Sequence, residues 1–266
     1  AKQAQVDVVA AYPITPQTII VERFSDYVAN GEVDTQFVCV ESEHSALSAC
    51  VGSSLAGSRV FTATSSQGLA LMHEVLYVAS GLRTPIVMAV VIRALSAPIN
   101  IHNDHSDMMG SRDCGWVQLY AENAQEAYDL TLQAFRIAEN PEVLLPVIVG
   151  LDGFTLSHTL ENVRVVSDDV IRKFVGVRSI PQVLTHEGRT VPFKLDSQNP
   201  MTMGPIALQN YYFEFKRQQE EAMRNALKVI QQINEEYAQL TGRSYGDGLL
   251  DAYCLEDAEI AIACLG

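Results

Sequence analysis

The chain has 266 residues, a length that suits one large domain or two small ones. Apolar residues make up 48% and charged residues 19%, which allows a sizeable core and excludes an intrinsically disordered chain. The 32 acidic and 18 basic residues give a net charge of −14, which repels phosphate backbones and argues against nucleic-acid binding.

No segment has the pattern of a signal peptide or a membrane span. The purest apolar run, Ile86 to Ile92, is far shorter than the roughly 18 residues that a membrane helix needs. The five cysteines show no paired spacing, are too scattered to ligate an iron–sulfur cluster, and are mostly expected in the core. We therefore expect a soluble, cytoplasmic protein that neither spans nor binds a membrane.

Short β-rich apolar runs alternate with helical patterns in the first half of the chain. Strands are predicted at 6–11, 36–40, 59–64, 85–92, 116–120 and 146–151. Helices are predicted at 15–30, 43–56, 67–80 and 124–139, and 96–115 is predicted to be a polar loop. This alternation is typical of an α/β fold with a doubly wound, mainly parallel sheet, here expected to form a domain over 1–160.

The second half is less regular. Residues 161–210 lack sustained periodicity and are predicted to form an extended arm, whereas 211–240 carries the apolar stripe of a long helix. We expect the arm and helix, 161–245, to pack on the first domain or on a partner. The apolar run 260–266 predicts a buried strand. We therefore expect 246–266 to begin a second, truncated α/β domain and the chain to be a fragment.

Polar side chains follow each of the first four predicted strands. They include Thr15, Glu43, the pair Ser65 and Ser66, and Arg93. Because ligands of open α/β sheets bind beyond the carboxyl ends of the strands, these loops predict one candidate site.

Each of these residues also has a structural interpretation. Thr15 suits a helix N-cap ahead of Pro16, and Ser65 and Ser66 suit capping as well. Glu43 suits the positive end of a helix dipole. Arg93 directly follows a buried strand, so its guanidinium needs an anionic partner, either another side chain or a ligand carboxylate or phosphate.

Other motifs do not support a site. His102, His105 and Asp107 lack a recognised metal-ligand spacing. No Gly-x-Gly-x-x-Gly follows a strand, and 65–68 is not a Gly-x-Ser-x-Gly elbow. The segment 246–248 is predicted to be a turn.

The four loops belong to a longer series of blocks that occur in order along the chain. The blocks are YPITPQT at 12–18, ESEHSA at 41–46, TATSSQGL at 62–69, DHSD at 104–107, RDCG at 112–115 and LDGFTLSH at 151–158. Together they resemble the α subunits of the pyruvate:ferredoxin oxidoreductases, or pyruvate synthases, within the 2-oxoacid:ferredoxin oxidoreductase family. The resemblance covers essentially the whole chain, with mild departures at Cys114 and at His44 and Ser45.

The resemblance implies a pyrimidine-binding domain of the thiamine-diphosphate fold. By this match Glu43 hydrogen-bonds N1′ of the aminopyrimidine, Thr15 and Arg93 hold the 2-oxoacid, and Ser66 and Gln67 contact the cofactor. A carboxylate at N1′ promotes removal of the thiazolium C2 proton by the neighbouring amino group. No metal is expected in this chain itself.

The resemblance also implies partners. Diphosphate and Mg²⁺ are expected in a β subunit, [4Fe-4S] clusters in β and in a ferredoxin-like δ subunit, and a γ subunit completes the hetero-oligomer. The implied reaction is reversible oxidative decarboxylation of pyruvate with coenzyme A to acetyl-CoA and CO2, with electrons passed to ferredoxin. A branched-chain 2-oxoacid or 2-oxoglutarate remains an alternative substrate, and a non-catalytic scaffold subunit is the alternative of another class.

Overall fold

The computed structural model describes residues 1–102 and 104–265. Its main sheet has six strands in the order β2-β1-β3-β4-β6-β5, all paired in parallel. The strands are β1 Val8–Ala11, β2 Gln36–Cys39, β3 Val60–Thr64, β4 Ile86–Val91, β5 Val117–Ala121 and β6 Val147–Leu151. The predicted parallel α/β sheet is therefore confirmed, with every strand within two residues of its expected bounds.

The helices follow the alternation that the sequence predicts, with several additions. They are η1 Lys2–Ala4, α1 Thr18–Ala29, α2 Glu43–Leu55, α3 Ser66–Leu71, α4 His73–Gly81, α5 Ser106–Gly110, α6 Ala124–Glu139, α7 Asp168–Val175 and α8 Tyr212–Thr241. A hairpin of β7 Gln182–Leu184 and β8 Thr190–Pro192 lies outside the main sheet. Among the helices of the described residues, none has the length and apolar character needed to cross a membrane.

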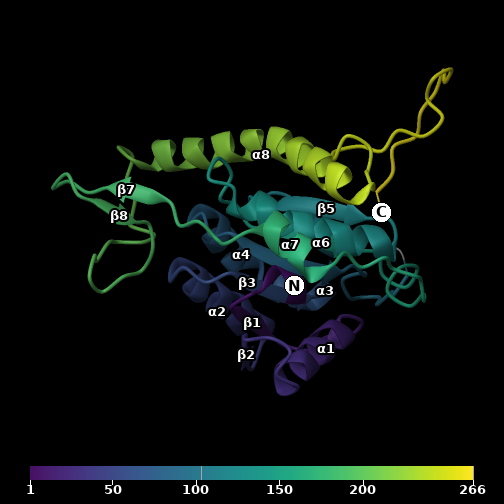
Figure 1. The fold of residues 1–266 in the computed structure, drawn as a ribbon, viewed down its shortest axis with the longest axis horizontal. Helices are drawn as coiled ribbons and strands as arrows, with labels where there is room; N and C mark the ends of the chain where they lie inside the picture. The colour runs from purple at the N-terminus through teal and green to yellow at the C-terminus, as the bar shows by residue number, and fades with distance from the viewer. Residues whose placement is uncertain (103, 266) are drawn as a thin grey trace.

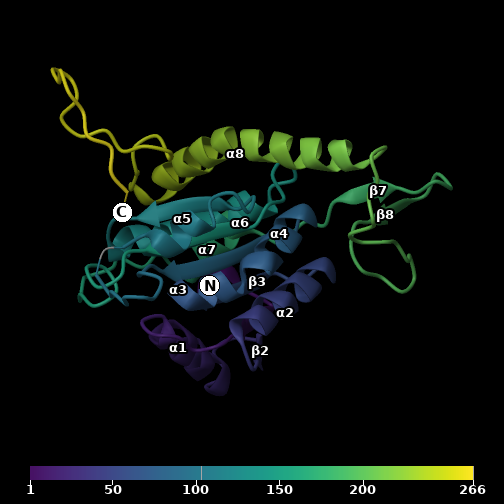
Figure 2. The same cartoon turned by 180° about the vertical axis from the view of Figure 1, so that it is seen from behind.

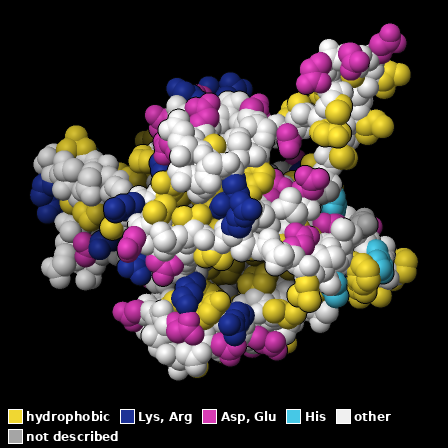
Figure 3. Space-filling view, turned by 45° about the vertical axis from the view of Figure 1, so that its right-hand side comes forward, with side chains coloured by type: hydrophobic (Ala, Val, Ile, Leu, Met, Phe, Trp, Pro, Cys, Tyr) yellow, Lys and Arg dark blue, Asp and Glu magenta, His cyan; other side chains and the backbone are white. Residues whose placement is uncertain are grey.

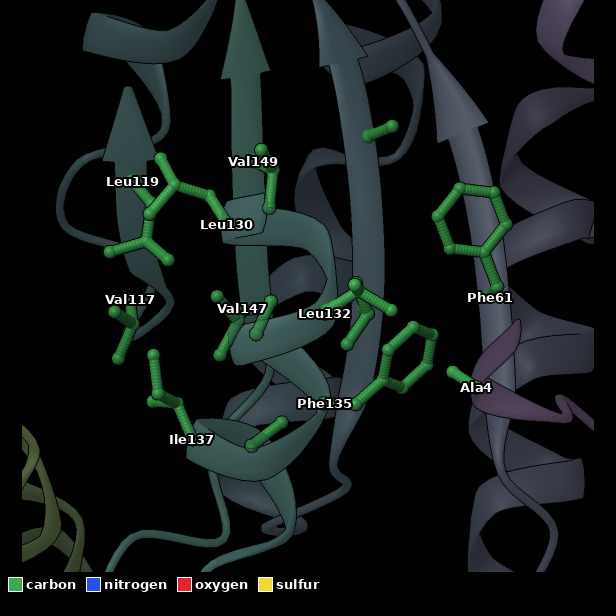
Figure 4. Close-up of a cluster of buried hydrophobic side chains, with 14 of the residues drawn as sticks. Ala4, Phe61, Val117, Leu119, Leu130, Leu132, Phe135, Ile137, Val147 and Val149 are labelled. Atoms are coloured by element: carbon green, nitrogen blue, oxygen red, sulfur yellow. The ribbon is translucent and has the colours of Figure 1, made fainter. Parts of the chain in front are cut away.

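Helices cover both faces of the sheet. Side chains of α2, α3 and α4 pack with one set of strand residues in one cluster, and those of α1, α6 and α7 pack with the alternate set in another (Figures 1 and 2). Figure 4 shows the second cluster, in which Phe135 of α6 packs against the sheet with its ring centroid 6.5 Å from that of Phe61 on β3. Because β3 and β4 are buried on both faces, their sequences are continuously apolar or small rather than alternating.

Helix α8 lies across the edge of this sandwich and is anchored by a buried carboxylate (Figure 1). The Asp129 side chain on α6 accepts hydrogen bonds from Tyr237 of α8, from Arg243 at 2.7 Å and from Tyr245 at 2.5 Å. Burial and the Asp129 charge raise the pKa of Tyr237, so its phenol stays a proton donor. Gly242 ends the helix in a left-handed conformation with φ of 71°.

The structure corrects three predicted elements and the expected burial of the cysteines. The predicted helix 67–80 is two helices, because ψ of −7° at Met72 interrupts the α-helical ladder while its buried side chain continues the apolar stripe. The predicted loop 96–115 contains α5, and the predicted arm contains α7 and the β7–β8 hairpin. Only two cysteines, Cys50 and Cys114, are buried, whereas the other three are exposed.

The predicted strand at 260–266 is wrong over 260–265, and Gly266 lies outside the described residues. No strand forms there, and Ile262 is 91% exposed. In Figure 3 this tail projects from the body and carries apolar side chains beside acidic ones. An apolar β-rich run forms a strand only where a neighbouring strand can pair with it. That 246–266 begins a second α/β domain stays a prediction.

The Asp129 cluster predicts a large stability effect at one position. Asp129→Asn removes the charge that pairs with Arg243 and should lower the free energy of unfolding by about 3 kcal/mol, because it leaves a half-buried cation unpaired. Urea unfolding of the chain measures this change. Glu221→Gln, which breaks an exposed pair with Arg217, should change the free energy by less than about 0.5 kcal/mol. Equal losses in the two variants would contradict the anchoring role.

Candidate active site

The candidate site lies at the topological switch point of the sheet, where successive strands are placed first on one side of β1 and then on the other. From β1 the chain passes to β2 on one side, and β3 then pairs on the other side of β1. In open parallel sheets such a switch point leaves a crevice between the loops that follow the two central strands. The loops after β1, β2, β3 and β4 carry all five residues that the sequence nominates.

Glu43 is the first residue of α2, directly beyond β2. Ser42 caps the helix by accepting a hydrogen bond from the Ser45 backbone N–H at 3.2 Å. The Glu43 side chain is 7% exposed, and within the described residues its carboxylate makes no hydrogen bond or ion pair. The helix dipole favours this carboxylate but does not compensate its removal from water. A buried carboxylate without a partner among the described residues is suited to accept a hydrogen bond from a ligand.

Gly68 of α3 makes room for that carboxylate. A Cβ atom at Gly68 would lie 2.8 Å from Glu43 Oε1 and 2.9 Å from Glu43 Cγ, and would also collide with Thr64 Oγ1. The Glu43 carboxylate and the Thr64 hydroxyl thus approach the same point on the α3 backbone. Only a residue without a side chain permits this approach, which explains the glycine in a helix interior.

Further polar atoms near the switch point are buried without partners. Thr64 Oγ1, Ser65 Oγ and Gln17 Oε1 have no hydrogen-bond partner among the described residues. The Gln17 amide N–H donates to the Tyr12 carbonyl at 2.9 Å and to the Ala63 carbonyl at 2.8 Å, which ties the β1 loop to β3. Since buried polar groups are normally satisfied, these orphan atoms indicate that a polar ligand completes the site. Sequence reasoning missed Gln17 and Thr64, although both lie at the carboxyl ends of strands, where ligands of open parallel sheets bind.

Arg93 lies one residue beyond Ile92, which directly follows β4, and is 6% exposed. Its Nε donates to the Thr15 carbonyl at 2.9 Å and its Nη1 to Gln67 Oε1 at 3.1 Å. Burial lowers the pKa of Arg93, with the charge of Asp107 opposing this shift. Within the described residues it forms no salt bridge and Nη2 donates no hydrogen bond, so the guanidinium can bind an anion.

Ser66 and Gln67 belong to the Arg93 side of the site. The Ser66 hydroxyl lies 2.5 Å from the Ala94 carbonyl and 2.8 Å from Gln67 Oε1. Gln67 Oε1 accepts from Arg93 Nη1, while the single Ser66 hydroxyl proton can be donated either to Gln67 Oε1 or to the Ala94 carbonyl. A role of either side chain in cofactor binding stays a prediction.

The structure does not bear out the capping roles considered for Thr15 and Ser65. Thr15 is not an N-cap, because α1 begins at Thr18 with Gln17 as its cap, and the exposed Thr15 side chain is left in the loop. Ser65 precedes α3, but its hydroxyl makes no capping hydrogen bond. His105 lies 3.4 Å from Asp152, and His102 stacks on Phe154. Across the described ranges no group of three His, Cys, Asp or Glu side chains could hold a metal ion.

Comparison with known proteins adds to this geometry. The family model described as pyruvate flavodoxin/ferredoxin oxidoreductase, thiamine diphosphate-binding, matches residues 1–235. Pyruvate synthase subunit PorA of Methanocaldococcus jannaschii is 52% identical over all of this chain, and PorA of Thermotoga maritima is 53% identical. The chain spans 66% and 64% of these two relatives.

A solved structure shares the fold. The 2-oxoglutarate:ferredoxin oxidoreductase of Magnetococcus marinus aligns with a TM-score of 0.62 at 21% identity, covering 85% of this chain and 42% of that chain. At this identity the likeness concerns the fold, which agrees with the predicted fold class.

The packing of Gly68 predicts opposite effects of two glycine substitutions. Gly68→Ala should lower the free energy of unfolding by about 1–3 kcal/mol, because the new methyl group overpacks the site. Gly52→Ala, in the interior of α2 with open space around it, should raise it by about 0.5–1 kcal/mol. Urea unfolding measures both, and a crystal structure of Gly68→Ala should show a displaced Glu43 carboxylate. A Gly68→Ala protein as stable as Gly52→Ala would refute the packing argument.

Proposed function

The chain belongs to the thiamine-diphosphate-binding family of pyruvate flavodoxin/ferredoxin oxidoreductases, and from this premise we propose that it is the catalytic α subunit of a pyruvate:ferredoxin oxidoreductase. The observation that carries the proposal is the buried Glu43 carboxylate, which is unpaired within the described residues, on the same sheet edge as the buried guanidinium of Arg93, whose Nη2 donates no hydrogen bond there. The reaction proposed is the reversible conversion of pyruvate and coenzyme A to acetyl-CoA and CO2, with two electrons passed to ferredoxin.

The residues at the switch point fit an aminopyrimidine. Glu43 offers an acceptor for a protonated ring nitrogen, and the orphan oxygens of Thr64 and Ser65 offer acceptors for an exocyclic amino group. Gly68 keeps the approach to Glu43 open. The chemistry supplied by bound thiamine diphosphate is nucleophilic attack on the keto carbon and uptake of the electron pair released with CO2.

Glu43 would hold a proton between its carboxylate and N1′ of the pyrimidine. Its burial matters here, because water would otherwise compete for the hydrogen bond and weaken the charge interaction. A charge-assisted hydrogen bond at N1′ makes the neighbouring amino group able to accept a proton. Glutamine at this position could hydrogen-bond the ring but could not take up the proton.

Arg93 would bind the carboxylate of the 2-oxoacid. Its Nε and Nη1 are fixed by Thr15 and Gln67, which orients the guanidinium and leaves Nη2 for the ligand. Neutralising the substrate carboxylate would reduce its repulsion by the Glu43 carboxylate in a site that is largely removed from water. Thr15 would contact the substrate through its exposed side chain. The small residues Ala94 and Ser96 after Arg93 suit a compact substrate such as pyruvate.

We further propose that the enzyme assembles with β, γ and δ subunits in the cytoplasm. Diphosphate and Mg²⁺ would be held by β, and [4Fe-4S] clusters by β and δ, as the family resemblance implies. On this division of labour, 1–160 is the pyrimidine domain and 161–245 its arm and helix. The isolated chain should then bind thiamine diphosphate poorly and show no turnover.

Glu43→Gln tests the proton-holding role. In the reconstituted complex, kcat for pyruvate-dependent viologen reduction with coenzyme A should fall about 10²-fold or more. Glutamine at position 43 cannot exchange a proton with N1′, so the neighbouring amino group would no longer be made able to accept a proton. Glu41→Gln is the matched control: this exposed glutamate two residues away bonds only Ser45, so its kcat should stay within about twofold. Unchanged kcat in Glu43→Gln would support the scaffold alternative instead.

Arg93→Gln tests substrate binding. KM for pyruvate should rise about 10–100-fold, the equivalent of one lost charge-assisted hydrogen bond, whereas KM for coenzyme A should not change. Arg112→Gln, on the exposed surface beside Asp113, is the control and should leave both constants unchanged.

The same assay with pyruvate, 2-oxoisovalerate and 2-oxoglutarate identifies the substrate of the wild-type complex. The highest kcat/KM should be obtained with pyruvate. A preference for either of the other two acids would favour the corresponding alternative, and equal loss for all three in Arg93→Gln is expected because the carboxylate is common to them.

A further inference from the structure

The mechanism above leaves one buried acidic group unused. Asp107 lies in the short helix α5, in the segment after β4, and is 3% exposed. The sequence motif around it suggested only a discounted metal site. Within the described residues Asp107 forms no salt bridge, and its carboxylate is held by hydrogen bonds.

These hydrogen bonds come from three backbone N–H groups. Asp107 Oδ2 accepts from Ser66 at 3.0 Å and from Arg93 at 3.2 Å, and Oδ1 accepts from Met108 at 2.7 Å. Ser66 starts α3 after β3, and Arg93 follows β4. One oxygen atom thus joins the loops at the carboxyl ends of two neighbouring strands.

The Ser66 backbone needs such support. Its φ of 45° is left-handed, a conformation that residues with a side chain rarely adopt. The Asp107 carboxylate accepts the N–H of this residue, and the next residue, Gln67, then presents its Oε1 to Arg93 Nη1. Burial raises the pKa of Asp107, while the three N–H groups favour its charged form.

We propose that Asp107 is a positioning residue that sets the affinity of Arg93 for the 2-oxoacid carboxylate by fixing the β3 and β4 loops relative to each other. This inference rests on the proposed function of Arg93. Asp107 itself contacts neither substrate nor cofactor: it acts through the backbones of Ser66 and Arg93. Its loss should therefore affect 2-oxoacid binding more than any other step.

Asp107→Asn in the assembled enzyme tests this. Asparagine has the same shape but one acceptor oxygen, so either the Ser66 and Arg93 amides or the Met108 amide loses its partner. KM for pyruvate should rise about tenfold or more and more than kcat falls, whereas KM for coenzyme A stays within about twofold. Asp104→Asn is the matched control, because within the described residues this half-buried aspartate in the same segment accepts a hydrogen bond from Ser106 alone.

The outcomes separate this inference from the proposed function. A wild-type complex without 2-oxoacid-dependent activity would overturn the proposed function. An active wild type with a pyruvate KM unchanged in Asp107→Asn, or with equal rises for pyruvate and coenzyme A, would overturn the positioning role alone.

If the Asp107→Asn subunit does not assemble, hydrogen exchange of the wild-type complex tests the positioning role of Asp107. Peptides that cover 65–68 and 91–95 should gain protection together when pyruvate binds, because Asp107 couples them. Protection confined to 91–95 would contradict the inference.

Discussion

Parallel strand pairing is the constraint on which the site depends. Because all six strands run in one direction, the chain leaves each strand at the same edge of the sheet. Arg93 and Thr15 are 78 residues apart in sequence, yet they share a hydrogen bond because β1 and β4 flank β3 in this sheet. A reversed strand would carry its loop to the opposite edge and divide the site.

The site is polar where the rest of the sheet is apolar, and this opposes stability. Gln17, Thr64 and Ser65 each hold a buried side-chain oxygen without a partner among the described residues, and each such group costs about 1–3 kcal/mol when left unsatisfied. The apolar clusters on both faces of β3 and β4 offset this cost. A ligand that satisfies these groups would therefore bind with a favourable contribution that the protein alone cannot obtain.

The regular elements were largely predictable because their signal extends over many residues. The buried run of β4 and the 16 residues of α6, which Asn123 caps in the structure, are predicted from the pattern of apolar residues alone. Helix α5 has only five residues, and the interruption between α3 and α4 is the single residue Met72. Neither feature alters an apolar pattern that extends over several helical turns. The strand predicted from the apolar run at 260 is wrong for a different reason: β-propensity is a local property, whereas a strand forms only with a partner strand.

The residues of the site could be nominated from the sequence, but their interactions could not. Thr15, Glu43 and Arg93 are predicted at one site because the carboxyl ends of parallel strands lie at the same edge of the sheet. The family resemblance supplies their proposed roles. Thr15 holds Arg93 through its backbone carbonyl, which any residue would provide, so its side chain remains available for a substrate. Asp107 illustrates the limit most clearly, since its neighbours in the sequence have metal-like residue types without a ligand spacing and cannot reveal that its partners are backbone N–H groups of two distant loops. Such contacts are set by how strands pair, and they become visible only in three dimensions.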